Sequence, residues 1–207
     1  MLVVGVLPAM ALADPVQWNN NGHWYEAVLV GPPGITWEDA RDAAVARGGY
    51  LVSITSASEN GFAYSLVSSN DAFWFTDQTW GNGIGPWLGG YQTDHLAEPA
   101  GDWAWVSGET WSYTNWMAGG PSNGAGGPGP TEDYLQFMGR AMLKADTWND
   151  FRDIGWIEND GSPLLPRGYI VEYDTYSVPE PASLALLGIG VAALLMRRQS
   201  HYGRTCA

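Results

Sequence analysis

The 207-residue chain carries 22 acidic against 9 basic residues, which gives a formal net charge of −13 at pH 7. A charge of this sign and size repels nucleic acid and anionic membranes, whereas it suits neutral glycans or divalent cations as partners. We therefore expect no nucleic-acid function. The single cysteine, Cys206, excludes an intrachain disulfide, so the domain depends on its apolar core for stability.

The N-terminus is predicted to be a signal peptide. Residues 1–13 form an apolar run that ends on the small-x-small pattern Ala11-Leu12-Ala13. This pattern is typical of secretory signal peptides and predicts cleavage before Asp14. A buried first strand is the alternative interpretation. Residues 14–177 then have the length of one domain.

The C-terminus has three parts in a fixed order. Val178-Pro179-Glu180-Pro181 leads into an uncharged apolar stretch from Ala182 to Met196, and Arg197 and Arg198 follow. The stretch is shorter than the about 20 residues that a stable membrane span needs, and the arginines favour the cytoplasmic side. Residues 178–207 resemble the PEP-CTERM sorting signal of Gram-negative bacteria, apart from an extra tail, SHYGRTCA.

This resemblance implies a route for the chain. It implies export, transient insertion of a transmembrane helix in the inner membrane, and processing by an exosortase-type peptidase. The expected destination is the cell surface or the extracellular matrix.

Residues 14–177 are predicted to hold two helices followed by a strand-rich, loop-rich half. In chain order we expect a strand at 22–30, a helix at 36–49, a strand at 50–54, a helix at 56–67, and short aromatic strands at 87–91, 102–116, 133–138 and 167–174. Thr36 and Ser56 are the predicted N-caps, with Glu59 completing a capping box, and Gly48 and Gly49 end the first helix. This order indicates an α+β domain with two helices, small antiparallel sheets, a long loop region and no disulfides.

Several motifs stand in the order that one family uses. They are W-x-x-A-R at 37–41, GGYLVSI at 48–54, WLGG at 87–90, WSYTNW at 111–116, EDYLQF at 132–137, TWND at 147–150 and GYIVEY at 168–173. Together they resemble a C-type lectin-like domain over residues 22–174. The resemblance implies a double-looped α+β fold whose N- and C-terminal strands pair.

The two disulfides that are usual in that family are both absent. One would join positions 44 and 171, which hold Ala44 and Val171 here. The other would begin at Tyr134 and end near Asp153 or Ile154. Because both bridges are missing together, we expect apolar packing to replace at least the first.

The resemblance also implies a calcium site that has lost two ligands. Glu132, Asn149 and Asp150 match three of its metal ligands, and Asp133 matches a neighbouring acidic position. The loop triplet that supplies a Glu and an Asn in sugar-binding members reads Gly120-Pro121-Ser122, and Asn123 stands one residue late. Calcium takes six to eight oxygens, so we expect weak binding, no better than roughly 10⁻⁴–10⁻³ M, or none. Ser122 and Asn123 complete the predicted ligand-binding set with Glu132, Asn149 and Asp150.

A metal-free interaction surface is the competing interpretation, since Glu132 and the Trp-Asn-Asp motif can serve the loop structure alone. A hydrolase is disfavoured. Residues 120–124 satisfy G-x-S-x-G, but the following GAGGPGP should not form the helix that a nucleophile elbow needs, and the only downstream histidine is His201. His23 and His95 are expected to be isolated surface residues, and Asn159-Asp160-Gly161 a turn.

We therefore expect a secreted or surface-displayed binding module, not an enzyme. Its expected partner is a glycan or exopolysaccharide, with Ca²⁺ as a weak cofactor or with no cofactor. A metal-free module for protein–protein adhesion or matrix structure is the alternative.

Overall fold

The computed structural model describes residues 14–78, 80–94, 99–126, 131–157 and 163–177. The predicted signal peptide (residues 1–13) and the sorting segment (residues 178–207), with its apolar stretch, lie outside the described residues. In the part of the chain that the structure describes, no helix has the length and apolar character that crossing a membrane requires.

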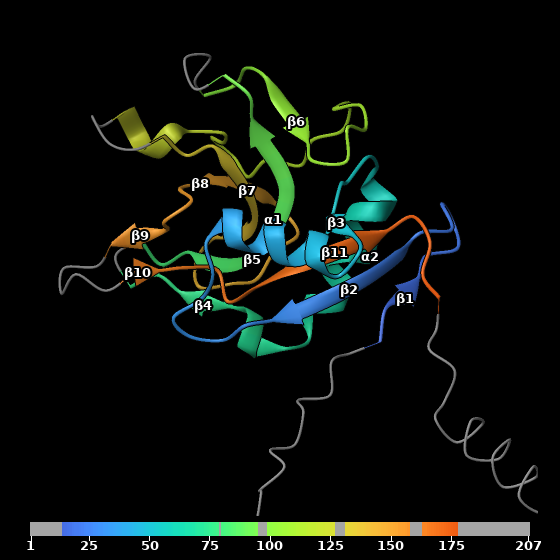
Figure 1. The fold of residues 1–207 in the computed structure, drawn as a ribbon. Coiled ribbons are helices and arrows are strands. Elements are labelled where there is room, and N and C mark those ends of the chain that lie inside the picture. The colour runs from blue at the N-terminus through green and yellow to red at the C-terminus, as the bar shows by residue number, and fades with distance from the viewer. Residues whose placement is uncertain (1–13, 79, 95–98, 127–130, 158–162, 178–207) are drawn as a thin grey trace, which may run out of the picture. The chain divides into compact units, whose positions relative to one another are not determined.

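Two α-helices and eleven short strands make up the described domain. In chain order they are β1 (Val16–Gln17), β2 (Trp24–Leu29), α1 (Trp37–Ala46), β3 (Tyr50–Leu51), α2 (Ala57–Ser68), η1 (Asp71–Phe73), β4 (Phe75–Thr76), β5 (Gly83–Gln92), β6 (Trp103–Trp105), η2 (Asn123–Gly126), β7 (Tyr134–Gly139), β8 (Trp148–Phe151), β9 (Trp156–Ile157), β10 (Pro163–Leu164) and β11 (Gly168–Tyr173), where η marks a 3₁₀ helix. Figure 1 shows their arrangement. The predicted α+β class is confirmed.

The strands join into one mixed sheet rather than several small ones. Its main order is β1-β2-β11-β5-β7-β8, with β3 added to β11, and β4 and β6 added to β5. The N- and C-terminal strands β2 and β11 pair antiparallel, as expected. A single parallel bridge between Tyr169 and Trp87 connects them to β5, and this bridge makes the sheet continuous. Only β9 and β10 form a separate hairpin within the described residues.

The helices begin where the caps predict. The Thr36 hydroxyl accepts the Asp39 N–H at 3.1 Å, and the Ser56 hydroxyl accepts the Glu59 N–H at 3.2 Å. Glu59 does not return to the Ser56 N–H as a full capping box would. Its carboxylate accepts instead from the N–H and hydroxyl of Thr55, at 2.7 and 2.8 Å.

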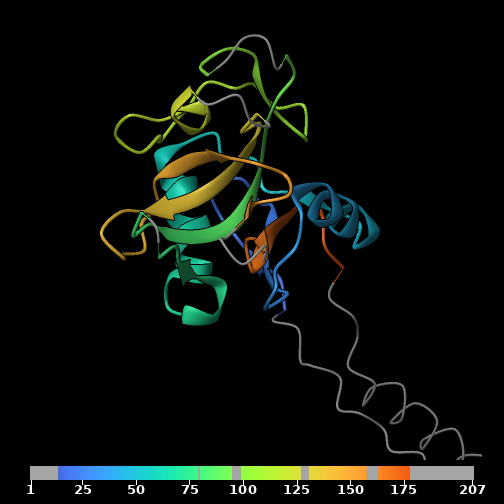
Figure 2. The same cartoon turned by 90° about the vertical axis from the view of Figure 1, so that its left-hand side faces the viewer.

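The two helices cover opposite faces of the sheet, which Figure 2 shows with α1 and α2 on different sides of β5, β7 and β8. Side chains alternate along a strand. Leu135 and Phe137 of β7 therefore point into the main core with α2. Tyr134 points to the other face, where it stacks on Trp37 of α1 at a centroid distance of 4.5 Å.

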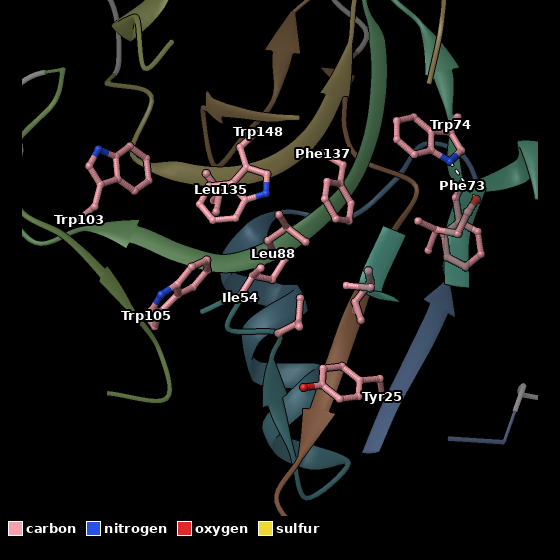
Figure 3. Close-up of a cluster of buried hydrophobic side chains, with 14 residues drawn as sticks. Tyr25, Ile54, Phe73, Trp74, Leu88, Trp103, Trp105, Leu135, Phe137 and Trp148 are labelled. Carbon is pink, nitrogen blue, oxygen red and sulfur yellow. Dashed lines mark hydrogen bonds between the residues drawn. The ribbon is translucent and has the colours of Figure 1, made fainter. Parts of the chain in front are cut away.

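Indole rings fill the core beneath the long loops. Trp148 is fully buried, and its ring lies 5.6 Å from that of Trp105 and 5.9 Å from that of Trp111. Its Nε1–H donates to Asn60 Oδ1 at 2.7 Å, so the one polar atom of the ring is satisfied. Figure 3 shows Trp148 with Leu135, Leu88 and Trp105 in this cluster.

Packing occupies the positions where the family's disulfides would stand. Ala44 and Val171 are both fully buried, as expected from the sequence. Tyr134, at the second position, is held by its stack on Trp37. Near the expected partner, Asp153 Oδ1 accepts the Glu38 N–H at 3.0 Å and so ties the segment after β8 to α1.

Candidate functional site

The long loop is attached to the sheet by Asp150 of β8. This carboxylate is fully buried, and its Oδ2 accepts the N–H of Ser122 at 2.7 Å and of Asn123 at 2.6 Å. The Gly120–Pro121 peptide bond just before them is cis. Burial raises the pKa of Asp150, and the two N–H bonds offset only part of that effect. Asp150 thus binds the backbone of the long loop directly.

Asn123 links the loop to the start of β7. Its side-chain Oδ1 accepts the Glu132 N–H at 3.1 Å, while its own N–H is bound to Asp150. Asn123 has a φ of 45°, a left-handed conformation that asparagine tolerates better than most residues. The chain from Ser122 to Gly124 is therefore held on both sides.

A cation from the chain itself lies beside Glu132. Glu132 is 6 % exposed, and its Oε1 is 3.9 Å from Arg152 Nε. Gly124 packs against both groups: a Cβ placed there would lie 3.2 Å from Glu132 Oε1 and 3.4 Å from Arg152 Nη2. Arg152 stands directly after β8 and belongs to none of the motifs in the sequence, so no sequence signal pointed to it.

Asn149 points to the opposite face of β8. Its side-chain N–H donates to the Asp150 carbonyl, and the residue is 7 % exposed. Its cross-strand neighbour on β7 is Gln136, a fully buried residue whose amide oxygen and nitrogen make no hydrogen bond within the described part of the chain. Buried amides of this kind usually bind water or a ligand.

The acidic side chains of the predicted calcium site contact other parts of the protein. Among the described residues, no group of three or more His, Cys, Asp or Glu side chains could hold a metal ion. Asp150 Oδ2 is committed to two backbone N–H groups, and Glu132 lies beside a guanidinium. The metal-ligand role of Glu132, Asn149 and Asp150 stays a prediction that this arrangement does not favour.

A pocket of about 330 Å³ opens beside these residues. It is bounded by the turn between β4 and β5, the long loop, the face of β7 and β8 away from α2, and Leu164 of β10. Ser122, Glu132 and Asn149 line it together with Trp80. The structure thus brings three of the five predicted ligand-binding residues to one cavity wall, and the other two, Asn123 and Asp150, hold that wall in place.

The serine motif has no catalytic surroundings. Ser122 follows a loop rather than a strand, and its N–H is bound to Asp150. Asn123–Gly126 form a short 3₁₀ helix, and residues 127–130 of the predicted non-helical segment lie outside the described residues. Within the described residues the only histidine is His23, which is bound elsewhere.

His23 is not isolated, contrary to expectation. Its Nδ1 lies 2.7 Å from Oε1 of the fully buried Glu172, and the imidazole is only 26 % exposed. Tyr25 connects Glu172 to a second buried carboxylate, since its hydroxyl lies 3.1 Å from Glu172 Oε1 and 2.6 Å from Glu59 Oε1. The pair of His23 and Glu172 could not be recognised from the sequence, because its members are 149 residues apart. His95 and Asn159-Asp160-Gly161 lie outside the described residues.

Burial raises the pKa of Glu172 to about 7, although hydrogen bonds from His23 and the Ser53 N–H oppose the shift. Burial alone would lower the pKa of His23, but the bond to Glu172 and its charge outweigh it, so the pKa of His23 is raised.

Comparison with protein families gives a direct match at the C-terminus. Residues 177–199 match the PEP-CTERM protein-sorting motif. The match confirms the resemblance noted in the sequence, and it marks the chain for export and sorting to the cell surface of a Gram-negative bacterium.

Curated relatives match the domain over part of their length. A perlucin-like protein of Mytilus galloprovincialis is 33 % identical over 120 residues, which cover 58 % of this chain and 64 % of the relative. A salmorin snaclec of Gloydius brevicauda is 33 % identical over 106 residues, which cover 50 % of this chain and 60 % of the relative. The chain thus spans somewhat under two thirds of the relatives it matches.

Solved structures establish the fold. The human scavenger receptor C-type lectin carbohydrate-recognition domain superposes with a TM-score of 0.52 at 21 % identity, over 78 % of this chain and 96 % of that one. Human lithostathine gives 0.52 at 17 % identity, over 78 % and 97 %. A complex of SPL-1 with GlcNAc gives 0.50 at 18 % identity, over 74 % and 89 %. The described domain has the C-type lectin fold, as the sequence predicted.

Proposed function

We propose that this chain is an exported, surface-sorted module that binds neutral glycans and does so without a metal ion. The sorting motif and the fold support the first part, since structural neighbours include a carbohydrate-recognition domain and a GlcNAc complex. The net charge of −13 disfavours polyanionic glycans, which the domain would repel.

The observation that carries the metal-free part is that the protein itself engages an oxygen of each acidic side chain. Asp150 Oδ2 accepts two N–H groups of the loop, while its buried Oδ1 has no hydrogen-bond partner among the described residues, and Glu132 is paired with Arg152. In a calcium-dependent site these oxygens would have to face the ion. Here the charge that calcium would supply comes from a guanidinium, and the loop geometry comes from hydrogen bonds.

The test is a polysaccharide array probed with the full chain, with and without EDTA. We expect binding to one or more neutral polysaccharides and the same signal after EDTA. A signal that EDTA removes and calcium restores would overturn the metal-free part. A chain that binds no polysaccharide on the array would overturn the glycan function itself.

A protein-adhesion module is the second candidate, because two large apolar side chains stand exposed on adjacent turns. Trp80 is 69 % exposed and Met142 is 70 % exposed, and the Met142 N–H donates to the Gly81 carbonyl at 2.7 Å. Exposed apolar groups of this kind favour association. Polysaccharide binding that survives the removal of the Met142 side chain but requires Trp80 would favour the glycan function over protein adhesion.

A further inference from the structure

We infer that the pocket between the β4–β5 turn and the face of β7 and β8 binds a single ring of a neutral polysaccharide, with Trp80 as its stacking surface. This inference rests on the proposed glycan function and assigns that function to a particular cavity. It places the sugar beside the predicted calcium ligands, against a turn that comes before the WLGG motif.

Hydrogen bonds of the turn hold the backbone at Trp80. Asp77 begins the turn: its N–H donates to the Asn82 carbonyl at 2.9 Å, and its carbonyl accepts the Gly81 N–H at 2.9 Å. Its carboxylate Oδ2 also accepts the Trp80 N–H at 3.1 Å. Although the backbone is held by these bonds, the indole is 69 % exposed, which is unusual for so large an apolar ring.

The connection between β7 and β8 supports the turn and is itself tied to the long loop. The Met142 N–H donates to the Gly81 carbonyl, so the β7–β8 connection supports the tip of the β4–β5 hairpin. Arg140 Nη2 donates to the Ala118 carbonyl at 2.6 Å and ties that connection to the long loop. A binding surface that is ordered before the ligand arrives loses less entropy on binding.

The chemistry of the walls is divided between an apolar floor and a polar rim. Ile84, Met138 and Phe151 are at most 7 % exposed and form the floor. Asn82, Arg140 and Asn149 offer amide and guanidinium groups around it. A pyranose has an apolar face of C–H groups and a rim of hydroxyls that both donate and accept, so it matches this division, as small-ligand pockets generally do.

The same walls exclude other ligands. Asp77 and Glu132 line the pocket together with Arg140, which leaves these walls with a net charge of −1 and disfavours a carboxylated or sulfated sugar. An apolar peptide side chain would match the floor and Trp80, but it would leave the amides of Asn82 and Asn149 without partners in the ligand. With a volume of about 330 Å³ the pocket lies at the small end of the usual range for ligand sites, which favours one ring over a long chain segment.

The test compares Trp80→Ala with Met142→Ala in the full chain, on immobilised α-glucan, β-glucan and mannan. Both side chains are about equally exposed on touching turns, but only Trp80 lines the pocket. We expect Trp80→Ala to weaken binding to whichever of these polysaccharides the parent binds by about tenfold or more, and Met142→Ala to leave it unchanged. Trp80→Phe keeps an aromatic face and should retain more affinity than Trp80→Ala.

Thermal unfolding of the three variants controls for misfolding, and an exposed ring should cost little stability on removal. If the parent binds a polysaccharide and Trp80→Ala binds it equally well, the pocket assignment is overturned while the glycan function stands. If Met142→Ala loses as much as Trp80→Ala, the exposed apolar surface and not the pocket does the binding, which also overturns the assignment. If the parent binds none of the three, the pocket assignment is overturned, and the polysaccharide array decides whether the glycan function itself stands.

Discussion

Arg152 lies beside Glu132, with 3.9 Å between its Nε and the carboxylate Oε1, at the place where the sequence predicts a calcium ligand. Both side chains are shielded from water, at 21 % and 7 % exposure. A carboxylate this buried needs a compensating cation or donor. The chain supplies that cation through Arg152, directly after β8, and this is the arrangement that the proposed metal-free binding requires.

The first prediction concerns this pair. Arg152→Met keeps the length of the side chain but removes the charge, and we expect a loss of about 1–2 kcal/mol in the free energy of unfolding because the buried Glu132 carboxylate loses the cation beside it. Adding Glu132→Gln should recover much of that loss. Chemical denaturation of the single and double variants provides the measurement.

Arg41→Met is the matched control. Arg41 forms a shorter ion pair, 2.9 Å from Asp42, but the two side chains are 40 % and 71 % exposed. Such a surface pair contributes little, so the control should change stability by less than about 1 kcal/mol. Equal losses for Arg152→Met and Arg41→Met would show that Arg152 does not compensate Glu132.

The second prediction concerns the attachment of the long loop. Asp150→Ala removes the acceptor of two N–H groups, and we expect about 2–3 kcal/mol lower stability and faster amide exchange at Ser122 and Asn123. Asp153→Ala, which removes an exposed acceptor of one N–H, should cost less and leave those two amides protected. Unchanged exchange at Ser122 and Asn123 in the Asp150 variant would contradict the role assigned to this carboxylate.

Local rules predicted the helices well because their signals are short-range. Thr36 and Ser56 cap the two helices through their own hydroxyls, a contact that spans only three residues. The predicted strand at 102–116 was far too long, because only Trp103–Trp105 pair with β5. Trp111 packs on Trp148 from a loop, and Trp116 adds only an isolated parallel bridge to Trp148, so the apolar character of this stretch reflects tertiary burial more than strand pairing.

The site was predicted only in part, because short-range sequence signals do not show which side chains meet in the fold. Glu132, Asn149 and Asp150 were found because they match a motif, but a motif does not tell what each oxygen contacts. Arg152 and Trp80 match no motif, and their roles come from the folding of the strand path and of the β4–β5 hairpin. The pair of His23 and Glu172 could not be found from spacing, because the two residues come together only when β2 pairs with β11.

The third prediction is a fall in stability with rising pH. The native pKa of Glu172 is raised from an ordinary value near 4.5 to about 7, and the pKa of His23 is raised above 6.5. Both groups bind a proton more tightly when folded, so their contribution is complete below the unfolded pKa values and is lost as pH rises through the folded ones. We expect about 2 kcal/mol less stability at pH 8 than at pH 5 from this pair.

Glu172→Gln checks that assignment, because it keeps the shape of the side chain and cannot titrate. Its stability should depend less on pH than that of the parent over this range. Asp174→Asn is the matched control, since Asp174 also approaches His23, at 4.0 Å, but is 73 % exposed. If the control flattens the pH profile as much as Glu172→Gln does, the buried pair is not its source.

The fourth prediction concerns processing. We expect the chain to be cut near Pro179 after export, since residues 177–199 match the sorting motif, and before Asp14, where the small-x-small pattern predicts signal-peptide cleavage. Intact mass analysis of the protein recovered from a native host should find both ends removed. A Pro179→Ala, Glu180→Ala variant should stay uncut. Recovery of wild-type protein that retains Cys206 as its bulk form would contradict this route.

The last prediction tests whether Arg152 has taken the place of calcium or merely lies near the old site. Gly120→Glu with Ser122→Asn restores the carboxylate and the amide that the loop triplet lacks; a Cβ at Gly120 meets nothing closer than the Met117 carbonyl at 3.3 Å, so a side chain fits with a small adjustment. We expect this double variant to show no calcium-dependent rise in melting temperature at millimolar calcium, because the guanidinium of Arg152 still lies beside Glu132 and repels a second cation.

Adding Arg152→Ser removes that cation and should produce calcium binding in the range of roughly 10⁻⁴–10⁻³ M, seen by calorimetry and by a calcium-dependent thermal shift. Calcium binding by the double variant with Arg152 intact would show that the guanidinium does not replace the ion. Failure of the triple variant to bind would show that Asp150, held by the Ser122 and Asn123 N–H groups, cannot turn toward a metal at all.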